Sequence, residues 1–252
     1  MISRWKQRPG QASAAAIDLL FPPRCAVCDR ECAALSGRPL WCLECEQALA
    51  PAAGPVCPRC AMPCPAADAA DGPCPNCRGK RFQFAAARAL GPYHGALRQA
   101  VLKMKHLRFE PLAAGLGQQL GAWLTALALP QMPELVIPVP MFWLKRLWRG
   151  TNPAESLARG VAKELRLPLA SDALVCCRYT KTQGTLRADE RRRNVRHAFR
   201  ASWRYNLRGA RILLVDDVMT TGATAQEAAR MLRQAGAAAV YVAAVARGTG
   251  NA

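Results

Sequence analysis

Closely spaced cysteine pairs are the most distinctive chemical feature of the 252-residue sequence. Ten of its twelve cysteines lie between Cys25 and Cys77, and eight of them form Cys-x-x-Cys pairs. A Cys-x-x-Cys turn points two sulfur atoms at one metal ion, and a second such turn brought back by a hairpin completes a tetrahedral site. The pairs therefore indicate structural zinc, because four protein ligands close a site to substrate.

The cysteine pattern repeats at a constant offset of 32 residues. Five cysteines of the first unit have a counterpart in the second, which indicates duplication of one small unit. The simplest partition places one zinc ion in each unit, whereas a crossed arrangement would let pairs from both units share an ion. Cys32 and Cys64 are not needed as ligands in the simplest partition. The expected ligands are Cys25, Cys28, Cys42 and Cys45 for one ion, and Cys57, Cys60, Cys74 and Cys77 for the other.

A pair of carboxylates follows an aliphatic run in the stretch RILLVDDVMTTGAT, which begins at Arg211. The aliphatic run predicts a buried strand, and the pattern after the glycine predicts a helix. In open parallel sheets, ligands gather where strands end and helices begin. The N–H groups at a helix start suit a phosphate, and Asp216 and Asp217 beside them suit sugar hydroxyls. The stretch therefore predicts a site for a ribose 5-phosphate group.

Other interpretations of such motifs are weaker here. A magnesium-binding strand of a nucleoside triphosphatase requires a Gly-rich loop ending in Gly-Lys-Ser/Thr, and the sequence contains none. The segment GLGQQLG at residues 115–121 is superficially like a dinucleotide fingerprint, but it lies inside a helical pattern and so predicts helix packing. A simple capped helix would not need the acids, the threonines and the glycine together.

The sequence after residue 81 alternates aliphatic runs with amphipathic stretches. This alternation is typical of a parallel sheet covered on both faces, so we expect an α/β fold. We also expect Cys176 and Cys177 to be small buried residues of one strand. No apolar run reaches the roughly 18 residues that a membrane-spanning helix needs. Residues 188–199 are expected to form a short helix or an ordered loop. Expected strands cover residues 84–90, 135–140, 173–179, 210–218 and 238–246, and expected helices cover 93–109, 110–129, 153–166 and 224–236.

Positive charge is concentrated in the C-terminal part of the chain. The formal net charge is +18, and residues 81–252 hold 26 Lys/Arg against 10 Asp/Glu. The stretch from Arg178 to Arg211 holds eleven Lys/Arg and two acids, which fits either a solvated face near a phosphorylated ligand or a track for single-stranded nucleic acid. Aromatic residues that could stack on bases are Tyr179, Phe199, Trp203 and Tyr205 there, and Phe142, Trp143 and Trp148 in a second basic segment.

The order of these features resembles the ComF family, whose members place a cysteine-rich zinc ribbon before a type I phosphoribosyltransferase-like domain. LLVDDVMTTGAT resembles the motif that binds phosphoribosyl pyrophosphate (PRPP). FPPRCAVC, YHGALRQAVLKMKHLRF, VIPVP followed by RGTNPAESLA, and RYTKTQGTLRADERRRNVRHAF resemble further family segments. We therefore expect residues 1–22 to form a tail with a short helix, 23–80 a double zinc ribbon, and 81–252 an α/β, parallel-sheet phosphoribosyltransferase-like domain.

The resemblance implies roles for individual residues. Asp216 and Asp217 would bind the ribose hydroxyls, and Arg149 and Asn152 would face the pyrophosphate. Magnesium would bridge oxygens of PRPP, mostly without direct protein ligands. The candidate catalytic residues are Asp216, Asp217 and Arg149. The implied PRPP loop comprises Asp216, Asp217, Val218, Met219, Thr220, Thr221, Gly222, Ala223 and Thr224, and the implied mobile segment carries Thr182, Gln183, Arg187, Arg191 and Asn194.

Two functions are consistent with this resemblance. The first is transfer of the phosphoribosyl group to an unknown nitrogen nucleophile, achieved by positioning and charge stabilisation, since the sequence offers no convincing general base. The alternative is a non-catalytic protein that binds single-stranded DNA during uptake, with DNA-uptake proteins as partners and the PRPP site as a sensor. Zinc-bound thiolates favour a cytoplasmic location in both cases. The chain departs from the family at two positions. It has Thr151 where family members usually have an aromatic residue, and Pro153 where they usually have glutamine.

Overall fold

The computed structural model describes residues 22–32, 40–65, 74–127, 131–181 and 187–249. The short helix expected within residues 1–22 lies outside the described residues. In chain order the helices are α2 (Leu43–Leu49), α4 (Gly95–Lys103), a short 3-10 helix (Leu107–Phe109), α5 (Glu110–Ala126), α6 (Trp143–Arg149), α7 (Pro153–Leu165), α8 (Ala188–Val195) and α9 (Ala223–Gln234).

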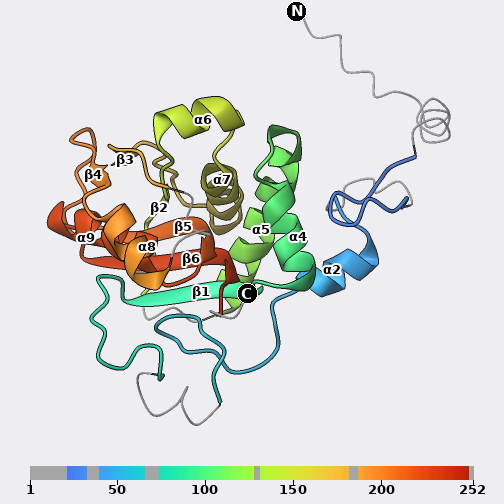
Figure 1. Cartoon of the computed structure of the whole chain (residues 1–252), viewed down its shortest axis with the longest axis horizontal. Helices are drawn as coiled ribbons and strands as arrows, with labels where there is room; N and C mark the ends of the chain where they lie inside the picture. The colour runs from blue at the N-terminus through green and yellow to red at the C-terminus, as the bar shows by residue number, and fades with distance from the viewer. Residues whose placement is uncertain (1–21, 33–39, 66–73, 128–130, 182–186, 250–252) are drawn as a thin grey trace, which may run out of the picture.

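Four parallel strands form the central sheet, in the order β1-β6-β5-β2. Aliphatic and small residues dominate all four, as expected for strands that are covered on both faces. The predicted α/β fold with a parallel sheet is therefore confirmed, and Figure 1 shows the sheet with its surrounding helices. The strands are β1 (Ala86–Pro92), β2 (Leu135–Pro138), β5 (Arg211–Met219) and β6 (Ala239–Arg247).

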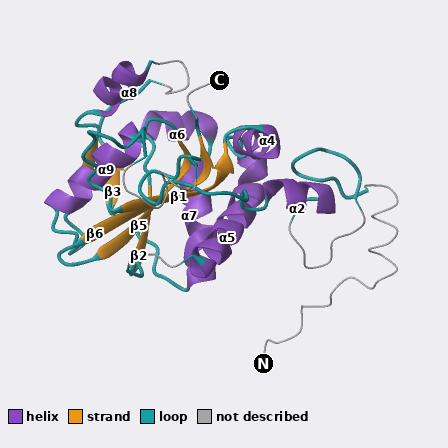
Figure 2. Ribbon diagram, turned by 90° about the horizontal axis from the view of Figure 1, so that it is seen from below, coloured by secondary structure: helices purple, strands orange, loops and turns teal. Residues whose placement is uncertain are grey.

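Alternate residues of each strand face opposite layers, because successive side chains of a strand point to opposite sides. Leu213 and Val215 of β5 belong to one buried cluster with helices α4, α5 and α7. Ile212 and Leu214 belong to a second buried cluster, which includes the apolar face of α9. Figure 2 shows the sheet with α5 and α7 on one side and α9 on the other. The two layers leave the carboxyl ends of β2 and β5 next to the first turns of α7 and α9.

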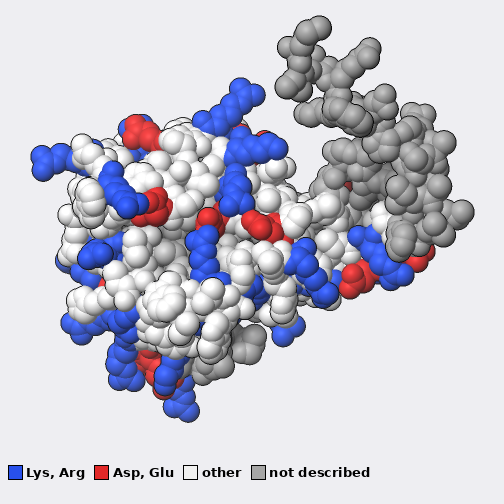
Figure 3. Space-filling view, turned by 90° about the horizontal axis from the view of Figure 1, so that it is seen from above, with Lys and Arg blue, Asp and Glu red and all other residues white. Residues whose placement is uncertain are grey.

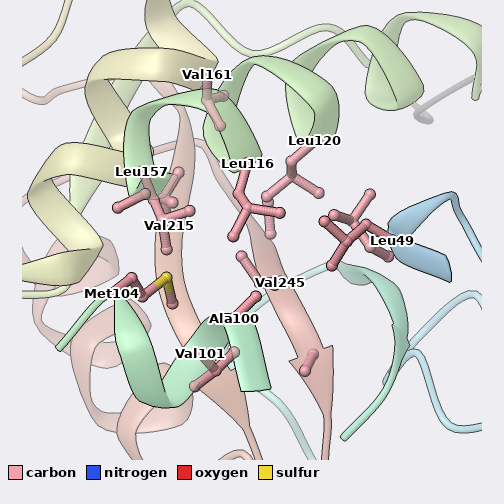
Figure 4. Packing of buried hydrophobic residues seen from close by; sticks show 14 of the residues in the cluster. Leu49, Ala100, Val101, Met104, Leu116, Leu120, Leu157, Val161, Val215 and Val245 are labelled. Carbon is pink, nitrogen blue, oxygen red and sulfur yellow. The ribbon is translucent and has the colours of Figure 1, made fainter. Parts of the chain in front are cut away.

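Helices α5 and α7 approach each other through two glycines. A methyl group on Gly117 would lie 2.2 Å from the carbonyl oxygen of Leu157, and one on Gly160 would lie 2.1 Å from that of Ala114. Only glycine allows the helices to pack this closely, since a side chain would collide with backbone carbonyl oxygens, which cannot move away as a side chain could. Around the contact, Leu116 and Leu120 pack with α7, as Figure 4 shows. The segment GLGQQLG is thus a helix-packing segment, as predicted.

One expected strand has a different partner from the one predicted. We expected the run at residues 173–179 to join the parallel sheet, but β3 (Leu174–Cys176) pairs antiparallel with β4 (Phe199–Ala201) in a separate two-stranded sheet. The strand β4 was not predicted, because three residues give too little periodicity to recognise. Cys176 is buried as expected, whereas Cys177 follows the end of the strand and is exposed, so that prediction was wrong.

The two cysteine-rich units attach to different parts of this domain. Trp41 and Leu49 of the first unit belong to the same buried cluster as α4, α5 and α7. The second unit lies below β1 in Figure 1 and has a small cluster of its own, which its four cysteines form with Met62 and Phe82 packed against them. The first unit is therefore part of the main core, and the second is joined to it at the edge of the sheet.

Candidate functional site

Two groups of four cysteines converge in the structure. Each group takes all its members from one repeat unit, and the sulfur atoms of each group lie within 4.8 Å of one another. The structure thus adopts the simplest partition and not the crossed arrangement. Cys32 and Cys64 belong to neither group. The groups are Cys25, Cys28, Cys42 and Cys45, and Cys57, Cys60, Cys74 and Cys77.

The sulfur separations suit a tetrahedral zinc ion. The Sγ atoms of Cys28 and Cys42 are 3.8 Å apart, those of Cys57 and Cys77 are 3.8 Å apart, and those of Cys60 and Cys74 are 3.6 Å apart. A tetrahedron with zinc–sulfur bonds of about 2.3 Å has edges of about 3.8 Å. Both groups therefore have the donors and the spacing of structural four-cysteine sites, consistent with two zinc ions per chain.

Backbone amides prepare the first site for a thiolate. The N–H groups of Cys28 and Cys42 point at the Sγ of Cys25, at 3.5 and 3.4 Å. Burial alone would raise the pKa of Cys25, but these amides and that of Val27 lower it to about 6. The deprotonated form is the one that binds metal, so the fold of the first Cys-x-x-Cys turn favours ligation by Cys25.

A pocket of about 210 Å³ opens at the carboxyl ends of β5 and β2. The start of α9, the segment after β2 and helix α6 complete its walls. This is the place at which ligands gather in open α/β sheets. Of the residues predicted to bind PRPP or its pyrophosphate, those lining the pocket are Arg149, Asn152, Asp216, Asp217, Val218, Met219, Thr220, Gly222, Ala223 and Thr224.

The two acids are held in place by the backbone beside them. Oδ1 of Asp216 accepts a hydrogen bond from the N–H of Asp217 at 2.9 Å, and Oδ1 of Asp217 accepts one from the N–H of Val218 at 2.7 Å. Burial and the neighbouring Asp217 raise the pKa of Asp216 well above its ordinary range, and Lys105 opposes this shift. Two crowded carboxylates of this kind favour hydroxyl donors or a cation as neighbours.

The turn into α9 borders the pocket. Gly222 is the N-cap of α9 and has a φ of 77°, a left-handed conformation that glycine adopts without strain. A methyl group at Gly222 would meet nothing within 4 Å, so the space above this residue is open. The first N–H groups of a helix have no carbonyl partner within the helix and carry its partial positive charge. Thr221 does not line the pocket; its hydroxyl accepts a hydrogen bond from the N–H of Ala223 at 3.4 Å.

Basic side chains form part of the pocket wall, and three of them, Lys105, Lys145 and Lys181, were not predicted as site residues. Arg149 was predicted, whereas Lys105 and Lys145 reach the pocket from beyond α4 and from α6. Nζ of Lys145 donates to the carbonyl oxygen of Thr180 at 2.7 Å and lies 5.2 Å from the centre of the Tyr179 ring. Burial and the neighbouring Arg149 lower the pKa of Lys145. The sequence signal for these lysines was their presence in basic segments, without an indication of where those segments lie.

Asn152 holds the loop that carries it. Its side chain is 7% exposed, and its Nδ2 donates to the carbonyl oxygen of Val139 at 3.2 Å. This bond joins the start of α7 to the end of β2 and fixes the floor of the pocket. Pro153 occupies the first turn of α7, where its missing N–H costs nothing.

The segment predicted to close over the site is anchored at both described ends. Asn194 binds the backbone of Lys181 twice, since its Oδ1 accepts from the N–H and its Nδ2 donates to the carbonyl oxygen, both at 2.9 Å. Arg187 and Arg191 belong to the start and body of α8 and do not line the pocket. Thr182 and Gln183 lie outside the described residues.

The basic stretch from Arg178 to Arg211 exposes fewer aromatic rings than its sequence predicts. Phe199 is buried, and the hydroxyl of Tyr205 donates to Asp172. Trp203 is 90% exposed and Tyr179 is 53% exposed. Trp148 of α6 is 82% exposed. Figure 3 shows Lys and Arg side chains spread over the face of the domain seen from above, with Asp and Glu less frequent.

Among the described residues, no helix combines the length and the apolar character needed to cross a membrane.

Comparison with protein families gives two matches along the chain. Residues 16–78 match the family described as "Double zinc ribbon domain". Residues 151–251 match the family described as "Phosphoribosyl transferase domain". The first match contains both cysteine groups, and the second contains β5, α9 and the loop between them.

Similar proteins include two with names that refer to DNA or competence. DNA utilization protein YhgH of Escherichia coli (strain K12) is 32% identical over 194 residues, which is 74% of this chain and 82% of that protein. Competence protein F of Haemophilus influenzae is 35% identical over 118 residues, which is 46% of this chain and 52% of that protein.

Two solved structures each match about half of this chain. A glutamine phosphoribosylpyrophosphate amidotransferase from B. subtilis, complexed with ADP and GMP, matches 52% of this chain and 25% of its own, with 24% identity and a TM-score of 0.36. A hypoxanthine phosphoribosyltransferase from Trypanosoma cruzi, complexed with the product IMP, matches 54% of this chain and 64% of its own, with 13% identity and a TM-score of 0.32.

Proposed function

The chain belongs to the ComF family, and from this premise we propose that its phosphoribosyltransferase-like domain binds PRPP in the pocket between β5, α6 and α9. The observation that carries the proposal is the position of Asp216 and Asp217 directly before an open, glycine-containing helix start. A phosphorylated ribose suits both features, because its hydroxyls can bind the two carboxylates and its phosphate can bind the helix start. The wall of basic residues then accounts for a second anionic group on the same ligand.

Each part of the pocket has a chemical role in this proposal. The amides at the start of α9 bind the 5-phosphate, because they lie at the positive end of a helix. Asp216 and Asp217 accept hydrogen bonds from the ribose hydroxyls. Lys105, Lys145 and Arg149 face the pyrophosphate. Asn152 acts indirectly, since its side chain holds the loop and not the ligand.

Magnesium fits this arrangement as part of the ligand. The pocket holds two carboxylates beside the expected position of the ribose, and hard oxygen donors of this type suit magnesium. When bound, the ion neutralises charge on the pyrophosphate. The protein's own contribution is to hold the sugar by its hydroxyls and phosphate so that its anomeric carbon is accessible to a nucleophile.

The proposed reaction is transfer of the phosphoribosyl group with loss of pyrophosphate. The bond from the anomeric carbon to pyrophosphate breaks and a bond to a nitrogen nucleophile forms. The basic wall stabilises the departing anion, and the acids stabilise positive charge that develops on the sugar.

A screen for PRPP-dependent pyrophosphate release tests this function. The purified chain, loaded with zinc and supplied with magnesium, would be incubated with PRPP and a panel of nucleobases and amines. We expect one chemical class of acceptor to accelerate pyrophosphate release above the rate with PRPP alone. PRPP binding without release for every acceptor would instead support the sensor alternative, and absence of binding would reject the site.

Binding of single-stranded DNA is the second candidate function. The exposed Trp203 in a stretch of eleven Lys/Arg and two acids favours it, because bases stack on exposed rings and phosphates attract the surrounding charge. The names of the relatives, which refer to DNA utilization and competence, point to the same process. Tyr179 and Trp203 are the aromatic residues of the stretch that remain accessible for such contacts.

Neutralising three arginines of α8 tests the DNA track. We expect Arg191→Gln, Arg192→Gln and Arg193→Gln together to weaken binding of an oligothymidylate. The slope of the logarithm of the binding constant against the logarithm of the salt concentration should become shallower by about two units, at about 0.7 for each of three lost phosphate contacts to a single strand. The measurement is fluorescence anisotropy at several salt concentrations. As a control of equal charge, Arg78→Gln, Lys80→Gln and Arg81→Gln should leave the slope nearly unchanged. Equal slopes for both triple variants would assign these arginines to another role.

A further inference from the structure

Arg247 is the most deeply buried charged side chain described in the structure. It is the last residue of β6 and is 2% exposed, with its guanidinium inside the protein. Removing a guanidinium from water costs several kcal/mol unless other groups replace the water. Its surroundings must therefore compensate the charge as well as the hydrogen-bond donors.

The donors of Arg247 are used to join two distant segments. Nε donates to the carbonyl oxygen of Cys60 at 2.8 Å, in the second cysteine group. Nη1 donates to the carbonyl oxygen of Met219 at 2.7 Å, and also to that of Thr220, in the loop before α9. A further bond runs to the carbonyl oxygen of Gly248 at 2.6 Å. One side chain thus connects a metal-ligand residue to the proposed phosphate loop.

The charge of Arg247 has no carboxylate partner among the described ion pairs. The second cysteine group lies beside the guanidinium, since Nε of Arg247 donates to the carbonyl oxygen of its member Cys60. Four thiolates around a zinc ion carry a net charge of about −2, which would lie next to the guanidinium. Arg88 of β1 places a second cation at the same group, where its Nη1 donates to the carbonyl oxygen of Pro58 at 2.6 Å.

The bonds from Arg247 also set the direction of the loop amides. In a trans peptide the N–H points opposite to the C=O. Because the carbonyl oxygens of Met219 and Thr220 face Arg247, the N–H groups of Thr220 and Thr221 point away from it. Met219 and Thr220 line the pocket and Arg247 does not. Gly248 supports the same geometry, since its N–H donates to the carbonyl oxygen of Met219 at 3.0 Å.

We propose that Arg247 is a positioning residue that couples the second zinc site to the phosphate loop. The zinc tetrathiolate supplies the negative charge that stabilises the buried guanidinium, and the guanidinium holds the loop carbonyls so that the loop amides face the ligand. Loss of the second zinc ion thereby loosens the loop. The part of this inference that concerns PRPP rests on the proposed function, whereas the link between zinc and the loop does not.

Arg247→Lys is the most informative variant, because it keeps the charge but loses the planar set of donors that reaches three segments. We expect it to weaken PRPP binding roughly 10-fold and to speed transfer of one of the two zinc ions to a chromogenic chelator, because it loses bonds both to the loop and to Cys60. Hydrogen exchange of a peptide that contains residues 219–224 should be faster in the variant. Circular dichroism and the melting temperature establish that the variant folds.

Arg88→Met is the matched control. Arg88 also contacts the second cysteine group, but its hydrogen bonds run to Pro58 and Ala87 and not to the loop before α9. We expect this variant to alter zinc release while leaving PRPP affinity and loop exchange within about twofold of the wild type. Equal loss of PRPP affinity in both variants would overturn the specific role of Arg247.

The outcomes also separate this inference from the proposed function. If the wild type does not bind PRPP, the proposed function fails, and the coupling is judged by zinc release and by exchange in residues 219–224. Faster zinc release together with faster loop exchange in folded Arg247→Lys supports the coupling. Wild-type zinc release and wild-type loop exchange in that variant would overturn it. A second experiment removes zinc from the wild type by chelation. Unchanged hydrogen exchange of residues 219–224 in the zinc-free protein would also overturn the coupling.

Discussion

Replacing Asp216 and Asp217 together by asparagine is expected to weaken PRPP binding by roughly 100-fold or more. Each carboxylate in the proposed site accepts a charge-assisted hydrogen bond from a ribose hydroxyl, and such bonds contribute about 1.5–3 kcal/mol each. Asparagine keeps the size of the side chain and an oxygen that can accept the local bond from the backbone. The fold should therefore survive, and isothermal titration calorimetry with PRPP and magnesium measures the loss.

Asp172→Asn is the control for this double variant. Asp172 is an exposed carboxylate that interacts with Tyr205 and Arg204 and does not line the pocket. We expect it to bind PRPP as the wild type does. Wild-type affinity in the Asp216→Asn, Asp217→Asn variant would show that the acids do not hold the ligand, and the site would have to be abandoned.

Replacing Cys45 by serine is expected to remove one of two zinc ions and to destabilise the whole domain. Cys45 is a buried member of the first cysteine group, and Trp41 and Leu49 on either side of it belong to the main core. If the first site opens, these two side chains lose their buried position, at a cost of about 1.5–3 kcal/mol each. We therefore expect a loss of roughly 3–6 kcal/mol in the free energy of unfolding, measured by urea denaturation.

Zinc content is measured on the same samples by elemental analysis. The wild type should contain two zinc ions per chain and Cys45→Ser one. Cys32→Ser is the control, because Cys32 lies near the first group without belonging to it, and its Sγ donates to the carbonyl oxygen of Pro23. A full zinc content in Cys45→Ser, or loss of zinc in Cys32→Ser, would contradict the assigned ligands.

Features set by local spacing could be predicted from the sequence. The cysteine groups follow from the repeat between Cys25 and Cys57, since four sulfurs in this spacing have few other arrangements. The position of Asp216 and Asp217 follows from an aliphatic strand that runs into a glycine turn and a helix. In both cases the residues that act together are close in the chain, so the pattern contains most of the geometry.

Features set by tertiary contacts could not be predicted. Cys60 and Arg247, which the structure joins, are 187 positions apart, and a strand that ends in arginine ordinarily suggests a solvated side chain. Lys105 and Lys145 reach the pocket only through the tertiary placement of the segment after α4 and of α6. The antiparallel pairing of β3 depends on Phe199, whose short strand has no recognisable period.

The most direct test of the central claim is a crystal structure of the zinc-loaded chain with PRPP and magnesium. The account predicts the 5-phosphate at the N–H groups between Thr220 and Thr224, and the ribose hydroxyls within hydrogen-bond distance of Asp216 and Asp217. The pyrophosphate should lie toward Arg149. Ligand density elsewhere on the protein, with this pocket filled by solvent at saturating PRPP, would contradict it.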